Sequence, residues 1–98
     1  MKTFIEGEEV IFEHTFYSDK AKSVPVDPTT VELFLEGPDS SSVEPSVSQD
    51  GARPANTGKY KATHIVDKWG IWDWRWETST PTIIKQGQFK VLQNNITD

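Results

Sequence analysis

Cysteine is absent from the 98 residues of this chain, which excludes a disulfide framework and any zinc site built on thiolates. Long apolar runs are absent as well, so the sequence predicts no membrane-spanning helix. No apolar stretch follows Lys2, as a secretion signal would require. An ordinary hydrophobic core must therefore hold the chain together, and its length suits a single domain.

Positive charge is also scarce. The chain has fifteen acidic residues against ten basic ones, a formal net charge of −5, and its only arginines are Arg53 and Arg75. An acidic surface does not attract a phosphate backbone, which argues against a nucleic-acid partner. The charge is typical of a domain that stays soluble and avoids non-specific contacts.

The common catalytic motifs are missing from the sequence. There is no G-x-S-x-G, H-E-x-x-H or phosphate-binding glycine loop. The only histidines, His14 and His64, fall on faces that we expect to point inward, where two ligands are too few for a metal ion. We therefore predict no catalytic residue, no cofactor and no metal, and we expect both histidines to lie near the rim of the core.

The apolar residues alternate with polar ones instead of following a helical period. Alternation is clearest over residues 10–17, 31–36, 59–66 and 88–92, as in half-buried antiparallel strands. Turn signals such as Asp50-Gly51 separate these segments. The sequence therefore predicts an all-β protein without a long helix.

The number and spacing of these segments predict an immunoglobulin-like (Ig-like) β-sandwich of about seven antiparallel strands. We expect one domain over residues 1–98, with an ordered core at about 3–92 and a frayed tail at 93–98. The loop Pro38–Pro54 is rich in Ser, Pro and Asp. Within it, we expect one weak strand around Val43–Val47.

All four tryptophans lie within Trp69–Trp76. Counting by two along a strand places Trp72, Trp74 and Trp76 on one face. The opposite face carries the mostly charged set Ile71, Asp73, Arg75 and Glu77. One buried face is the expected arrangement, and burying an indole removes roughly 200 Å² from water. The pattern therefore indicates core positions, more strongly for Trp72 and Trp76 than for Trp74.

The alternative is a carbohydrate-binding module in which flat indole rings stack on sugars. Such a platform needs polar residues beside the rings, whereas here they point to the other face. Trp69 lies outside the alternation, in the turn before Gly70. Two interpretations stay open for it: a partner contact, because tryptophan is enriched at interface hot spots, or a cap over the end of the sandwich.

The alternation on all the strands predicts which side chains form the core. We expect the core to contain Val10, Phe12, Phe16, Val31, Leu33, Leu35, Tyr60, Ala62, Trp72, Trp74, Trp76, Phe89 and Val91.

Five short motifs follow one another along the chain. They are Pro28-Thr29-Thr30-Val31-Glu32-Leu33, Asp50-Gly51, Thr57-Gly58-Lys59-Tyr60-Lys61-Ala62, Gly70–Glu77 and Gly87-Gln88-Phe89-Lys90-Val91. In this order and spacing, from about Ile5 to Leu92, the chain resembles a family of small Ig-like proteins encoded by tailed bacteriophages. His64 and Trp69 depart from the family pattern, which has an apolar residue at the first position and a small residue or proline at the second.

The resemblance implies a non-enzymatic structural protein of the virion, made in the bacterial host cytoplasm. It would be a head decoration or cement protein present in many copies, or an accessory protein at the neck, the head–tail junction. Its partners would be the major capsid protein or head–tail connector proteins, with no nucleic acid and no membrane. The alternative is a carbohydrate-binding Ig-like adhesion module on the virion surface. As partner contacts we predict the turn that holds Trp69 and the loop Pro38–Pro54, and within them Trp69, Lys68, Asp39 and Ser41.

Overall fold

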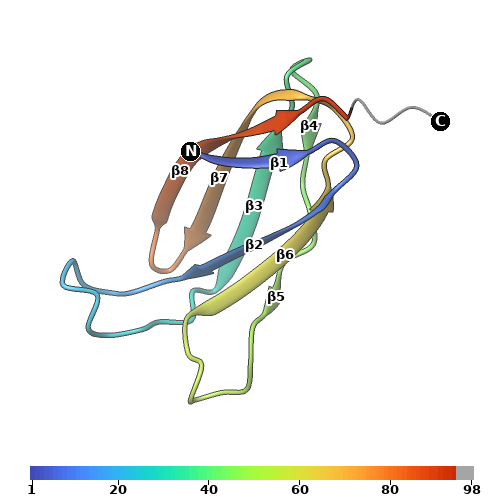
Figure 1. Ribbon diagram of the computed structural model, residues 1–98. Coiled ribbons are helices and arrows are strands. Elements are labelled where there is room, and N and C mark those ends of the chain that lie inside the picture. Colours follow the sequence, from blue (N-terminus) through green and yellow to red (C-terminus); the bar gives the residue numbers. More distant parts are fainter. Residues whose placement is uncertain (95–98) are drawn as a thin grey trace.

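The computed structural model describes residues 1–94, and these residues form eight β-strands and no helix (Figure 1). The strands are β1 (Lys2–Ile5), β2 (Glu9–Thr15), β3 (Thr30–Glu36), β4 (Ser42–Val43), β5 (Ser48–Gln49), β6 (Lys59–Ile65), β7 (Gly70–Ser79) and β8 (Ile83–Leu92). The prediction of an all-β protein is confirmed. Of the tail predicted to fray, residues 95–98 lie outside the described part of the chain.

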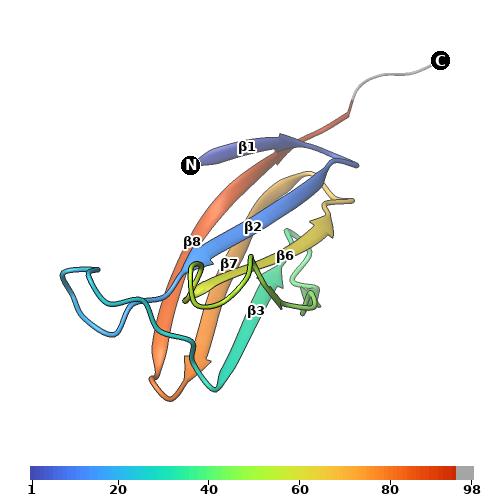
Figure 2. The same ribbon diagram turned by 90° about the horizontal axis from the view of Figure 1, so that it is seen from below.

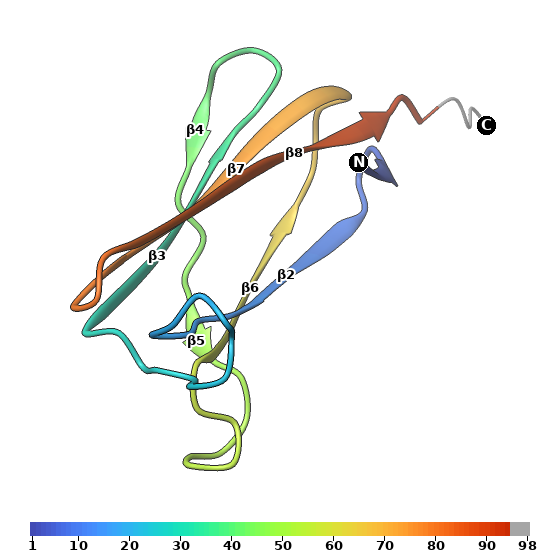
Figure 3. The ribbon, with the colours of Figure 1, turned by 90° about the vertical axis from the view of Figure 1, so that its left-hand side faces the viewer.

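The strands form two sheets that face each other in a sandwich-like arrangement (Figures 2 and 3). The larger sheet has the order β1-β8-β7-β3-β4, and the smaller has the order β2-β6-β5. All neighbours pair antiparallel except β1, which runs parallel to β8. The sequence predicted antiparallel strands throughout, and this parallel edge strand departs from that expectation.

Strand β7 shows the alternation that the sequence predicts. Trp72 and Trp76 point into the sandwich and are 1% and 2% exposed, while Trp74 on the same face is half-buried. The charged side chains of Asp73 and Arg75 point outward and are exposed. One aromatic face of the strand therefore supplies much of the core, as expected for a sheet with one solvated side.

The core is built from both sheets. Its buried apolar residues are Val10, Phe16, Leu33, Leu35, Tyr60, Ala62, Val66, Trp72, Trp76, Phe89 and Val91. Three residues predicted for the core, Phe12, Val31 and Trp74, are only partly buried and pack against this cluster. Val66, which was not among the predicted core residues, is fully buried, and it continues the inward-facing positions of Tyr60 and Ala62 on β6.

The weak strand expected around Val43–Val47 is not formed as one strand. Instead, β4 pairs with β3 in the larger sheet, and β5 pairs with β6 in the smaller one. Pro45 lies between them and is buried. Proline has no N–H for a ladder hydrogen bond, so the chain crosses from one sheet to the other at this point. The structure consequently has eight strands instead of about seven.

An ion pair between Arg53 and Asp27 fixes the loop that precedes β6. Arg53 Nε donates to both carboxylate oxygens of Asp27 at 3.0 and 2.9 Å. The same carboxylate accepts hydrogen bonds from Gly58 N at 2.8 Å and from the Tyr60 hydroxyl at 3.3 Å. Asp27 therefore ties three parts of the chain together, and no local sequence pattern indicates this role.

Candidate functional site

Two loops meet at one end of the sandwich. One joins β3 to β4 (37–41), and the other joins β6 to β7 (66–69). They approach closely because Gly70 has no side chain: a Cβ there would lie 2.7 Å from Pro38 Cγ. Gly70 also has a φ of +130°, which disfavours other residues. Only glycine at this position allows the two loops to pack together.

Three of the four predicted contact residues, Asp39, Ser41 and Lys68, come together on these loops. Lys68 Nζ lies 3.3 Å from Asp39 Oδ2 and 3.4 Å from Ser41 Oγ, although Lys68 and Ser41 are 27 positions apart in the sequence. Trp69 follows Lys68 directly and is 56% exposed. We refer to Asp39, Ser41, Lys68 and Trp69 as the Trp69 site. That these residues bind a partner stays a prediction.

Asp39 organises its own loop. Its Oδ1 accepts hydrogen bonds from Ser41 Oγ at 2.6 Å and from Ser41 N at 3.2 Å. These bonds from Ser41 lower the pKa of Asp39 to about 2, and the neighbouring Lys68 ammonium adds a smaller effect in the same direction. Asp39 is therefore ionised at any physiological pH and keeps the Lys68 ammonium beside it.

The pH dependence of this loop follows from the lowered pKa. A carboxyl whose pKa is lower in the folded state favours that state above its unfolded pKa, and the effect is lost as pH falls through the folded value. We expect the Asp39 carboxyl carbon to titrate at about pH 2 in an NMR experiment. Ser41→Ala should raise the midpoint further than Lys68→Met does. A wild-type midpoint near the ordinary value of about 3.9 would show that the loop is not organised in this way.

The buried indole of Trp72 supports both loops from the core side. Its Nε1 donates a hydrogen bond to the Lys68 carbonyl at 2.9 Å. A Cβ on Gly37 would lie 3.6 Å from Trp72 Cη2, so the start of the other loop rests on the same ring. The Trp69 site is thus held by the core, and its residues need little ordering before they meet a partner.

Trp69 itself contributes little to the fold. Because more than half of the side chain is exposed, we expect Trp69→Ala to change the free energy of unfolding by no more than about 0.5 kcal/mol. Urea unfolding followed by circular dichroism measures this. A loss of several kcal/mol would instead identify Trp69 as the cap over the end of the sandwich that the sequence left open.

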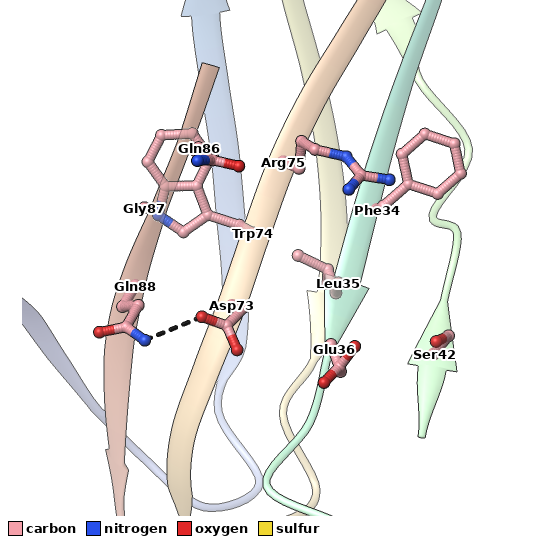
Figure 4. Close-up of a pocket in the computed structure, with 10 residues that line it drawn as sticks. All are labelled: Phe34, Leu35, Glu36, Ser42, Asp73, Trp74, Arg75, Gln86, Gly87 and Gln88. Carbon is pink, nitrogen blue, oxygen red and sulfur yellow. Dashed lines mark hydrogen bonds between the residues drawn. The ribbon is translucent and has the colours of Figure 1, made fainter. Parts of the chain in front are cut away.

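A second feature is a shallow cavity of about 570 Å³ on the outer face of the larger sheet (Figure 4). Its polar wall includes Asp73, which accepts a hydrogen bond from Gln88 Nε2 at 2.9 Å. The Arg75 guanidinium lies over the Phe34 ring at 5.2 Å from its centroid. Asp73 and Arg75 thus have partners on the sheet itself, as on an ordinary solvated sheet face.

The burial and packing of the aromatic rings argue against the carbohydrate-binding alternative. Trp72 and Trp76 are buried, so their faces are not available to a sugar. Arg75 covers the Phe34 ring on the outer face. None of these three rings offers a free flat surface for stacking.

The two histidines lie at opposite ends of the pair formed by β2 and β6. His14 is opposite Tyr60, and His64 is opposite Val10. His64 packs near Trp72. The two imidazoles thus contact different parts of the core and do not meet. Within residues 1–94, no group of three or more potential ligands could hold a metal ion.

Comparison with known proteins does not assign the chain to a family or a function. No protein-family model matches the chain, and no curated protein matches it significantly in sequence. The function must therefore be argued from the residues and their arrangement.

Sequence reasoning missed several contacts around these sites. The packing of Pro38 on Gly70 and the support from Trp72 join residues that are distant in sequence. The only local signal was Gly70, which indicated a turn but not what would pack against it. Strand β1 pairs in parallel with β8, and no periodicity of the sequence reveals this pairing.

Proposed function

We propose that the chain is a non-enzymatic structural protein of a bacteriophage virion that binds other virion proteins through the Trp69 site. The observation that carries the proposal is the exposed indole of Trp69, next in sequence to Lys68, whose ion pair with Asp39 joins two loops that contact the core. Exposed tryptophans on rigid supports are typical of interface hot spots. The family resemblance of the motifs supplies the phage context.

The strand order supports an Ig-like assignment. In an Ig-like assignment, β8, β7, β3 and β4 of the larger sheet would correspond to strands G, F, C and C′ of a variable domain, and β2, β6 and β5 would correspond to B, E and D. Two hallmarks of antibody domains are absent. The chain has no cysteine for an inter-sheet disulfide, and its buried tryptophans lie on β7 instead of the strand in the C position.

Such a domain would sit on the head as a decoration protein or at the neck as an accessory ring. In either place it binds a surface that forms only during assembly, such as the major capsid protein lattice or the head–tail connector. Many weak contacts on a repeated surface give a high overall affinity through multivalency. A modest site built around one tryptophan is sufficient for that purpose.

Cosedimentation tests the proposal. The purified, tagged protein is mixed with phage particles that lack it, and bound copies are counted by quantitative mass spectrometry. Copies in proportion to the capsid subunits would identify a head decoration protein, and copies matching a single ring would identify a neck protein. Absence of binding to the particles would contradict the proposal. A parallel pull-down on cell-surface polysaccharide tests the adhesion alternative.

A further inference from the structure

The outer edge of β8 is only half covered. Strand β1 pairs with Phe89–Leu92, from Lys2 opposite Phe89 to Ile5 opposite Leu92. Among the strands of residues 1–94, none pairs with Ile83–Gln88 on the side away from β7. Figures 1 and 2 show β1 beside only the C-terminal half of β8. This half-edge leaves a row of backbone N–H and C=O groups free for another strand.

A cleft lies where this free edge meets the start of β1, and Met1, Lys2 and Gln88 are among the residues that line it. It has a volume of about 350 Å³ and opens between the two sheets, where β8 and β2 lie on opposite layers (Figure 3). Its apolar lining includes Phe4, Phe12, Trp74, Trp76 and Phe89. Three of these, Phe4, Phe12 and Trp74, are only partly buried by the rest of the chain. An apolar side chain that entered here would complete their burial.

Trp74 is placed to meet such a strand. It is opposite Gly87 on β8, and a Cβ on Gly87 would lie 2.6 Å from Trp74 Cζ2 and 3.0 Å from Nε1. The indole therefore crosses over Gly87 toward the free edge. Trp74 Nε1 has no hydrogen-bond acceptor within the described residues, and no buried nitrogen of those residues is left unpaired. The indole N–H is accordingly open to solvent at the mouth of the cleft.

Lysines lie at the cleft and beside it, although the chain as a whole has a net charge of −5. Lys2 lines the cleft, together with the acidic Glu13. Lys85 is opposite Trp76 and shares its inward face. Burial, followed by the charges of Lys85 and Lys22, lowers the pKa of His14 in the same cleft, which keeps the imidazole neutral at neutral pH.

These lysines have no ionic partner within residues 1–94. The salt bridges there use Arg53, Lys61, Lys68 and Arg75, and none uses Lys2, Lys22 or Lys85. A segment that carries a carboxylate opposite Lys85 would therefore meet an unpaired charge. If two copies of the chain paired through this edge, their Lys85 side chains would approach each other. The repulsion between these charges disfavours self-association.

We propose that this half-edge is a docking site for an extended, acidic segment of a partner protein, which adds a strand to β8 beside Ile83–Gln88. Its backbone hydrogen-bonds to β8, an apolar side chain fills the cleft beside Trp74, and a carboxylate faces Lys85. Strand addition of this kind takes affinity from the backbone and specificity from alternate side chains. The site is separate from the Trp69 site, and either can exist without the other.

A short peptide tests the proposal directly. The probe is acetyl-Thr-Leu-Thr-Glu-Thr-Val-Thr-amide, whose inward side chains would be Leu, Glu and Val, and the matched control has Lys in place of Glu. NMR titration should shift the amides of Ile83–Gln88 and the Trp74 indole N–H with the Glu peptide. We expect the Lys peptide to bind about tenfold more weakly, and Lys85→Glu to reverse the preference.

A second measurement covers the case in which the free peptide binds too weakly to be detected. Continuing the register of Lys2 opposite Phe89, the extension Val-Thr-Glu-Thr-Leu fused before Met1 places Leu opposite Gly87 and Glu opposite Lys85. It should slow hydrogen exchange at Ile83–Gln88 and raise the melting temperature, and the same extension with Lys for Glu should do so less. Absence of protection with both extensions would overturn the proposal. So would concentration-dependent dimerisation of the unmodified chain through this edge.

Discussion

Trp72→Ala is expected to lower the free energy of unfolding by about 3–5 kcal/mol, the range for truncating a large aromatic side chain in a core. Trp72 is 1% exposed, and its ring stacks on Phe89 with centroids 5.8 Å apart and planes at 15°. The substitution removes this packing and the hydrogen bond to Lys68 O. Urea unfolding followed by circular dichroism measures the loss.

Trp72→Phe separates the two contributions. It keeps an aromatic ring in the core but removes the indole N–H, so it should cost less than Trp72→Ala. It should also shift the NMR signals of Lys68 and Trp69, because the Lys68 carbonyl loses its partner. If Trp72→Ala left the unfolding midpoint unchanged, the assignment of β7 as the central core strand would be wrong.

Gly58→Ala is expected to lower the free energy of unfolding by about 2–5 kcal/mol, from backbone strain and overpacking together. Gly58 has a φ of +85°, and a Cβ there would lie 2.6 Å from the Phe16 carbonyl oxygen and 3.1 Å from that of Val26. Both obstacles are backbone atoms that cannot rotate away. The change would also strain the hydrogen bond from Gly58 N to Asp27.

Gly7→Ala is the matched control for this prediction. Gly7 has a similar φ of +94°, but a Cβ on this residue would have nothing within 4 Å of it. Alanine at this position bears only the cost of the left-handed conformation, about 1–2 kcal/mol. Equal losses for the two variants would mean that the backbone of Phe16 and Val26 does not pack tightly against Gly58. The difference between the two therefore measures the steric contribution.

Much of the fold follows from local sequence pattern. In a strand, alternate side chains point to opposite faces, so one buried position fixes the whole strand. This is why the alternation placed Trp72 and Trp76 in the core and Asp73 and Arg75 outside it. The same reasoning ranked Trp74 below its neighbours, and the structure leaves Trp74 half-buried at the cleft beside β8.

The parts that sequence did not predict depend on contacts between distant residues. The parallel pairing of β1 with β8 sets which half of that edge stays open, and alternation carries no information on strand partners. The crossing at Pro45 depends on which sheet each short strand can join. The Asp27–Arg53 contact joins residues 26 positions apart. Each of these requires three-dimensional proximity that no local pattern encodes.

The Trp69 site was predicted from the sequence only in part. An exposed turn tryptophan and a polar loop could be picked out by residue type, but residue type alone offers no reason for the loops to meet. Gly70 and Trp72 bring them together, one by the absence of a side chain and the other through its N–H. The core thereby determines the geometry of the surface that we propose as the contact.

The most direct test of the central claim compares binding of two variants to phage particles that lack the protein. Trp69 and Val24 have nearly equal exposure, 56% and 53%, but only Trp69 belongs to a proposed contact. We predict that Trp69→Ala reduces cosedimentation at least about tenfold, as loss of a hot-spot residue does. Binding by Val24→Ala and the melting temperatures of both variants should remain close to wild type. Unchanged binding by Trp69→Ala would contradict the account.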